Sequence, residues 1–232
     1  MRNTQRIARA RAFGKLHDRT GVLIVPNAWD AASARVFEAV GFPAVATTSG
    51  GVAWSLGYAD GERAPFEELV DAAARIVRAV KVPVTVDMES GYGNTPAAVG
   101  VSVGRMIEAG AAGINIEDSR QSPAILRDVS DAASRIRAAR SAAVAAGVPI
   151  VINARVDTYL IEFGAGAGER LAETIRRAKA YLAAGADCIY PIGLGDTVEL
   201  RALIDAIDAP VNVAAKPGLP GVAELARIGI AR

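Results

Sequence analysis

The segment Val80-Lys-Val-Pro-Val-Thr-Val-Asp87-Met-Glu89-Ser-Gly-Tyr-Gly93 contains one complete structural period of this chain. Its proline redirects the backbone after a helical stretch, β-branched residues form a strand over 84–87, and a glycine-rich turn follows. Glycine or proline precedes most of the other apolar runs in the same way. The pattern predicts parallel strands at 22–26, 44–47, 84–87, 113–117, 150–154, 188–191 and 211–214, with helices between them.

These seven strand–helix units predict an α/β fold. The strands are almost continuously apolar, which indicates a parallel sheet that is covered by helices. The chain of 232 residues is close to the usual length of a (β/α)₈ barrel, about 250 residues. We therefore predict a single TIM-type barrel domain over 1–232, with its eighth unit missing or incomplete. A doubly wound open sheet is the alternative, and a barrel open at one seam would expose strand edges.

Composition narrows the class of protein. Hydrophobic residues make up 51% of the chain and charged residues 22%, which suits a packed core rather than disorder. The 26 basic and 25 acidic residues leave a net charge of +1, so we expect neither a nucleic-acid nor a membrane partner. A single cysteine excludes an internal disulfide, and a single histidine excludes most histidine-based catalytic and metal sites. The absence of a signal-like or membrane-spanning apolar run favours the cytoplasm.

Carboxylates follow two neighbouring predicted strands. Asp87 and Glu89 share one face of a strand by the period-two rule, and Glu117 ends the next strand. In either architecture the site lies beyond the carboxyl ends of the strands. Three acids that meet there would repel one another unless a hard cation such as Mg²⁺ bound them. The alternative is that they cap helices or pair with arginines, which is the role we expect for Asp30 and Asp118.

Other polar residues lie at the same end of the predicted sheet. Arg155 can hold a substrate carboxylate in a bidentate fork, or it can form a salt bridge to Glu117 or Asp157. The small residues Ser49, Gly50 and Gly51 allow backbone N–H groups to approach an anion closely. The connection after them carries Asp60, which is either part of a mobile lid or an ordinary solvated acid.

The chain resembles the isocitrate lyase/phosphoenolpyruvate mutase superfamily. Six ordered motifs carry the resemblance: Pro26-Asn-Ala-Trp-Asp-Ala-Ala-Ser33, Thr48-Ser-Gly-Gly51, Ser55-Leu-Gly-Tyr-Ala-Asp60, Asp87-Met-Glu-Ser-Gly-Tyr-Gly93, Gly113-Ile-Asn-Ile-Glu-Asp118 and Asn153-Ala-Arg155. The resemblance implies a (β/α)₈ barrel that binds Mg²⁺, with Mn²⁺ possible, and a small 2-oxo acid or phosphono acid. It also implies C–C or P–C bond chemistry and a homo-oligomer.

The resemblance assigns roles to particular residues. It implies that Asp87 is the central metal ligand, with Glu89 and Glu117 binding the ion directly or through water. It implies that Ser49, Gly50 and Gly51 bind the oxo acid, that Arg155 clamps its carboxylate, and that Asp60 belongs to the gating loop. These assignments, like the fold, are expectations to be compared with the structure.

One family motif differs in this chain. Isocitrate and methylisocitrate lyases carry a Lys-x-Cys-Gly-His loop after the equivalent of Glu117, whereas this chain has Ser119-Arg-Gln-Ser-Pro-Ala-Ile-Leu126 and no thiol there. We expect an Mg²⁺-dependent lyase that cleaves a C–C bond of a small 2-oxo acid precursor through a metal-stabilised enolate. The alternatives are phosphoenolpyruvate mutase or phosphonate hydrolase-like P–C chemistry, and a catalytically weak 2-oxo acid binding protein.

Overall fold

The predicted barrel is confirmed by a computed structural model, which describes residues 3–121 and 124–232. Ser122 and Pro123, in the loop without a thiol, lie outside the described residues. Six parallel strands lie at the centre in the order β1 (Asn27–Ala28), β2 (Val45–Thr47), β3 (Val84–Asp87), β4 (Gly113–Glu117), β7 (Val151–Val156) and β8 (Cys188–Pro191). A separate antiparallel pair, β5 (Ser119–Gln121) and β6 (Ala124–Leu126), follows β4.

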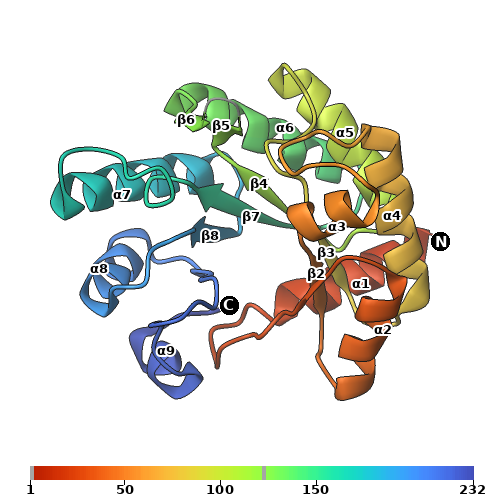
Figure 1. Ribbon diagram of the computed structural model, residues 1–232, viewed down its shortest axis with the longest axis horizontal. Coiled ribbons are helices and arrows are strands. Elements are labelled where there is room, and N and C mark those ends of the chain that lie inside the picture. The colour runs from red at the N-terminus through yellow and green to blue at the C-terminus, as the bar shows by residue number, and fades with distance from the viewer. Residues whose placement is uncertain (1–2, 122–123) are drawn as a thin grey trace.

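Helices surround these strands (Figure 1). They are α1 (Asn3–Lys15), α2 (Ala31–Val40), α3 (Ser49–Ser55), α4 (Phe66–Ala79), α5 (Pro96–Ala109), α6 (Val129–Ala146), α7 (Ala167–Ala183), α8 (Thr197–Ile207) and α9 (Val222–Ile228). The glycines that were expected to end helices do so: Gly110 and Gly147 adopt left-handed backbone angles directly after α5 and α6. None of the described helices is long and apolar enough to cross a membrane.

The first and last predicted strands are wrong in their bounds, because no strand forms over 22–26, where β1 begins only at Asn27, or over 211–214. Residues 22–26 approach the sheet, but ladder pairing begins only at Asn27. Pro26 lacks an N–H group, so it contributes only its carbonyl oxygen, which accepts from Ala46 N at 2.9 Å. At the other end, Val211 forms a single parallel bridge to Ile189 in place of the strand predicted at 211–214.

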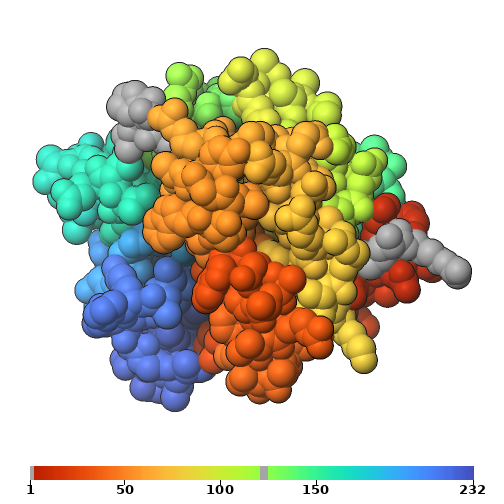
Figure 2. Space-filling view, turned by 45° about the vertical axis from the view of Figure 1, so that its right-hand side comes forward, coloured from red at the N-terminus to blue at the C-terminus, as the bar shows by residue number. Residues whose placement is uncertain are grey.

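The seam between these two segments is joined by the last residues of the chain. Ala231 N donates to Val211 O at 3.0 Å, Leu23 N donates to Ala231 O at 2.8 Å, and Val213 N donates to Arg232 O at 2.8 Å. Figure 2 shows the C-terminal segment, in blue, in contact with the N-terminal unit, in red-orange. Ala231 and Arg232 therefore join the two segments through backbone hydrogen bonds, and the barrel is closed at this seam.

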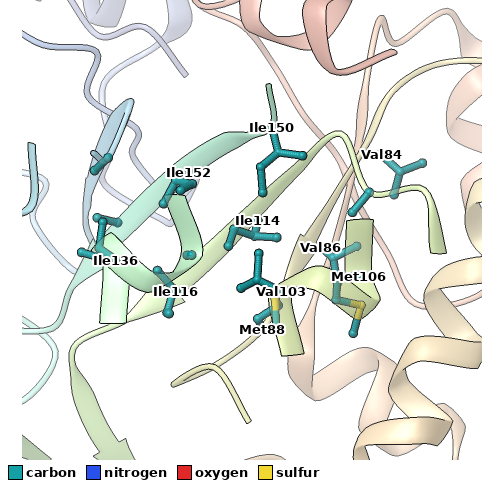
Figure 3. Packing of buried hydrophobic residues seen from close by; sticks show 14 of the residues in the cluster. Val84, Val86, Met88, Val103, Met106, Ile114, Ile116, Ile136, Ile150 and Ile152 are labelled. Carbon is teal, nitrogen blue, oxygen red and sulfur yellow. The ribbon is translucent and has the colours of Figure 1, made fainter. Parts of the chain in front are cut away.

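The strands use their two faces differently. Apolar side chains on the outer face of the strands pack against Val103 and Met106 of α5 and Ile136 of α6, as Figure 3 shows for Val84, Val86, Met88, Ile114, Ile116 and Ile152. On the inner face, Asn153 Nδ2 donates to Asn115 Oδ1 at 2.9 Å. The parallel sheet is confirmed. Along its strands, however, apolar side chains on the outer face alternate with side chains on the inner face, which leaves polar groups inside the barrel.

Candidate active site

A cavity of about 580 Å³ opens at the carboxyl ends of the strands. Its polar lining comes from successive strand ends and includes Thr47, Thr48, Ser49, Asp87, Asn115, Arg155, Tyr190 and Asn212. The parallel register sets this arrangement, because Asp87 pairs with Asn115 across β3 and β4, and Arg155 pairs with Glu117 and Tyr190. The volume suits a small ligand, which is commonly held by a few convergent polar groups.

Asp87 is fixed in this cavity by bonds from three directions. Its backbone N–H donates to Thr47 Oγ1 at 2.9 Å, and its carboxylate accepts from Glu89 N at 3.2 Å and from Ser49 N at 3.4 Å. Burial raises the pKa of the Asp87 carboxyl above its ordinary value, and the positive charge of Arg155 offsets this only in part. A carboxylate that is costly to keep charged is stabilised by a cation beside it.

The prediction that Glu89 shares a strand face with Asp87 is wrong. β3 ends at Asp87 and Glu89 has φ of 48°, so the period-two rule no longer applies after the strand. Glu89 instead accepts from Tyr92 Oη at 2.8 Å and from Glu62 N at 2.6 Å. Burial raises the pKa of Glu89 to about 7 against the opposing effect of these two bonds. Its carboxylate therefore fastens the connection between α3 and α4 to the turn after β3.

The salt-bridge alternative for Arg155 is confirmed. Its Nη1 lies 2.8 Å from Glu117 Oε2, and its Nε lies 2.6 Å from Asp157 Oδ1. Burial alone would lower the pKa of Arg155, but the carboxylates of Glu117, Asp157 and Asp87 raise it above its ordinary value. The guanidinium stays charged and its side chain still lines the cavity, so the two acids orient it without removing it from the ligand space.

The three predicted metal ligands do not form a ready-made cluster. No group of three or more histidine, cysteine, aspartate or glutamate side chains within residues 3–121 and 124–232 is arranged to hold a metal ion. Of the three, Asp87 lines the cavity, Glu89 bonds to Glu62 and Tyr92, and Glu117 pairs with Arg155. Mg²⁺ commonly retains several waters and uses one or two carboxylates. The donor set fits an ion that is held directly by Asp87 and otherwise by water.

The start of α3 brings one of the three predicted small residues, Ser49, to the cavity. Thr48, the residue before α3, makes no side-chain capping bond, and Ser49 lines the cavity. A Cβ on Gly51 would lie 2.6 Å from Thr48 Cγ2, and one on Gly50 would lie 3.3 Å from Asp60 Oδ2. Asp60 is exposed, but its carboxylate lies over Gly50. The structure therefore brings Asp60 and the start of α3 together.

The sequence interpretation missed several polar residues of this region. Asn115, Tyr190 and Asn212 line the cavity, and Glu62 bonds to the turn after β3. A signal for Asn115 existed, because it is a polar residue between two isoleucines of a strand and the period-two rule places it opposite them. Glu62 carried no such signal, since an acid in a polar connection is ordinarily solvated.

The structural roles expected for two other acids are confirmed. Asp30 Oδ1 accepts from Ser33 N at 2.7 Å and caps α2. Asp118 Oδ2 accepts from Tyr181 Oη at 2.6 Å and lies 3.0 Å from Arg177 Nη1, in the buried layer between β4 and α7. Neither carboxylate lines the cavity.

Comparisons with known proteins agree with this geometry. The model of the phosphoenolpyruvate phosphomutase family matches residues 13–232. An uncharacterised protein of Mycobacterium tuberculosis H37Rv is 38% identical over 95% of this chain and 80% of its own length. The 2-methylisocitrate lyase of Escherichia coli K12 is 30% identical over 87% of this chain and 68% of its own.

Solved structures share the fold closely. A Burkholderia cenocepacia J2315 protein that was assigned to the phosphonomutases superposes with a TM-score of 0.93 at 43% identity, covering 98% of this chain and 90% of its own. The structure of 2,3-dimethylmalate lyase superposes with a TM-score of 0.83 at 28% identity, covering 96% of this chain and 78% of its own. The chain is an enzyme of the isocitrate lyase/phosphoenolpyruvate mutase superfamily.

Proposed function

We propose that this protein is a divalent-metal-dependent lyase that cleaves a C–C bond of a small 2-oxo acid precursor. The observation that carries the proposal is the placement of Asp87, Arg155 and Ser49 around one cavity at the carboxyl ends of the strands. Cleavage beside a 2-oxo acid leaves an enolate, whose developing negative charge needs fixed positive charge and N–H donors. This cavity offers both the fixed positive charge and the N–H donors within one space.

Arg155 is the residue that binds the substrate carboxylate in this proposal. Its bonds to Glu117 and Asp157 hold the guanidinium in one orientation, which lowers the entropy cost of binding. In this proposal Ser49, Gly50 and Gly51 at the start of α3 bind the other end of the ligand; Ser49 lines the cavity, and its N–H already donates to Asp87 Oδ2. The glycine positions let the ligand approach the backbone closely.

Asp87 is the residue that would hold the metal ion directly, with Glu89 and Glu117 acting through water. When bound, Mg²⁺, or Mn²⁺ in its place, supplies positive charge next to the 2-oxo acid. Asp60 lies over Gly50 on the connection that leads to α4, and its carboxylate can take a proton from the substrate there. That connection can also exclude water from the cavity when it lies closed over the ligand.

Ligand binding at Asp87 tests the metal assignment separately from turnover. Oxalate resembles an enolate of a 2-oxo acid, and we expect it to raise the melting temperature of the protein only when MgCl₂ is present. Asp87→Asn keeps the shape of the side chain but removes its charge, and it should abolish this Mg²⁺-dependent shift. Asp205→Asn makes the same change at an exposed site on α8 and is the matched control. An unchanged shift in Asp87→Asn would contradict the assignment.

Turnover tests the reaction. Small 2-oxo acid precursors and phosphono acids are incubated with the Mg²⁺-loaded protein, and the products are followed by mass spectrometry. Release of a 2-oxo acid by C–C cleavage supports the lyase, and release of phosphate or a rearranged phosphono acid supports the P–C alternative. Oxalate binding without any turnover supports a 2-oxo acid binding protein and contradicts the lyase.

A further inference from the structure

A second cavity, of about 410 Å³, lies outside the barrel mouth and shares no lining residue with the first. Four arginines line it: Arg63, Arg120, Arg127 and Arg135. Glu62 is the one acidic residue among its described lining residues. Four cations and one acid in one concave space leave a local excess of positive charge, although the chain as a whole is close to neutral.

The acids near this cavity are already engaged. Glu62 Oε1 accepts from Ser90 Oγ at 2.8 Å and from Tyr92 N at 2.9 Å, so this oxygen bonds to the turn after β3. Asp131 is shared between two cations, at 3.1 Å from Arg135 Nε and 3.6 Å from Arg127 Nη1. Two carboxylates therefore face four guanidinium groups, and each of the two carboxylates already has hydrogen-bond or ion-pair partners.

Arg127 is the buried donor of the cavity. Its side chain is 10% exposed, and its Nη2 donates to Ser90 Oγ at 3.2 Å. Its Nε is buried and has no hydrogen-bond partner among the described residues. A buried donor without a partner is costly, and burial together with the charges of Arg135 and Arg120 lowers the pKa of Arg127. An anion in the cavity would give Arg127 a hydrogen-bond acceptor and would offset the positive charge of the neighbouring arginines.

Two further arginines are available at the rim. Arg63 and Arg120 are exposed, and neither side chain makes a hydrogen bond or ion pair with the described part of the chain. Arg63 belongs to the connection between α3 and α4, whereas Arg120 belongs to β5. The guanidinium fork matches the oxygens of phosphate and carboxylate groups in a bidentate geometry. The rim therefore contributes two guanidinium groups from two different segments of the chain.

We propose that this cavity binds the oxyanion of a small molecule, a phosphate or a carboxylate group, at a site separate from the barrel mouth. Arg127 supplies the buried contact, and Arg63 and Arg120 close on the anion from the two sides. Because residues 61–63 adjoin Asp60, a bound anion also fastens the connection that carries Asp60 to the rest of the barrel.

Calorimetric titration tests the site. Inorganic phosphate and malonate are titrated at constant ionic strength into the full-length protein in EDTA, so that no metal contributes. We expect saturable binding of phosphate, of malonate or of both, and the more tightly bound anion identifies the source of the oxyanion. The Arg63→Gln/Arg120→Gln double variant should weaken binding by about tenfold or more, since each variant removes charged hydrogen bonds. Both residues are exposed, so the variant should fold normally.

Two controls locate the site. Arg78→Gln removes the same charge from an exposed position on α4, outside the cavity, and should leave the affinity unchanged. Asp87→Asn alters the barrel mouth and should also leave it unchanged, which separates this result from the test of the lyase. Hydrogen exchange of residues 56–65 should slow when the anion binds. The proposal is overturned if neither anion binds, if Arg78→Gln weakens binding as much as the double variant, or if Asp87→Asn abolishes binding.

Discussion

At the scale of single residues, we expect substitution of Arg155 to cause a large loss of stability. Its side chain is 12% exposed and forms ion pairs with two acids that are almost completely buried, Glu117 and Asp157. Arg155→Met should lower the free energy of unfolding by about 3–5 kcal/mol, because both buried carboxylates lose their ion pair with Arg155. Urea denaturation at neutral pH measures the change.

The double variant Arg155→Met/Glu117→Gln is the control for that prediction. Removing one of the two carboxylate charges that lose this ion pair should recover part of the lost stability, since the residues act as a pair. If Arg155→Met alone proves as stable as the parent protein, then these ion pairs do not contribute to the stability of the barrel.

At the scale of elements, Asp30 determines the start of α2. Its side chain accepts from the backbone N–H of Ser33, and these bonds lower the pKa of Asp30 below its ordinary value of 3.8. Asp30→Ala should cost about 1 kcal/mol of stability at neutral pH. A lowered pKa in the folded state stabilises the protein above the unfolded pKa, so this contribution falls as the pH drops below about 3.8.

The stability difference between Asp30→Ala and the parent should therefore narrow under acid, as measured by urea denaturation across pH. Asp30→Asn is the matched control, because asparagine caps helices about as well but does not titrate in this range. A gap between Asp30→Ala and the parent that stays constant down to acid pH would show that the charge of Asp30 has no part in the cap.

Two helical glycines should respond to alanine in opposite directions. A Cβ on Gly51 would lie 2.6 Å from Thr48 Cγ2 and 3.0 Å from Trp29 Cβ, so Gly51→Ala should destabilise α3 by about 1–3 kcal/mol. Gly104 in α5 has no atom within 4 Å of the added Cβ, and Gly104→Ala should stabilise the protein by about 0.5–1 kcal/mol. Thermal unfolding compares the two, and a stabilising Gly51→Ala would contradict the close packing at the start of α3.

At the scale of the whole molecule, we expect stability to depend on the seam at residues 231–232. Ala231 is completely buried, and its N–H donates to Val211 O, which also accepts from Arg232 N at 3.2 Å. Ala231→Pro removes the first donor and leaves Val211 O with the longer bond from Arg232 N, so stability should fall by about 1–3 kcal/mol. Ala231→Gly retains the amide and serves as the control in the same urea titration. Equal stability of the two variants would show that the bond at the seam is not needed.

Assembly is the other property of the whole molecule, and the expectation of a homo-oligomer stays a prediction. Val36 and Val40 of α2 are 59% and 70% exposed, and Trp54 of α3 is 70% exposed. Exposed apolar side chains of this size on surface helices are typical of surfaces that associate. We expect light scattering to give a mass above that of one 24.0 kDa chain. The mass of a monomer at every concentration would contradict the prediction.

The sequence by itself determined the parallel barrel and the end of it where the site lies. Periodic apolar strands, helix-ending glycines and polar strand ends are local features, and each acts within a few residues of itself. They predict that Asp87, Arg155 and Ser49 lie at the same end of the sheet, where these residues line one cavity. They also predicted the helix cap at Asp30, because a cap depends on only the next three residues.

Only the tertiary structure decided which of these residues face the cavity and what closes the barrel. Glu89 leaves the strand face because a turn with positive φ begins after Asp87, and its partners are Tyr92 in the same turn and Glu62, 27 residues earlier. Arg155 pairs with Glu117 and Asp157 because the register of β4 and β7 brings them together. Ala231 and Arg232 close the seam through backbone hydrogen bonds, which carry no side-chain pattern that a sequence could show.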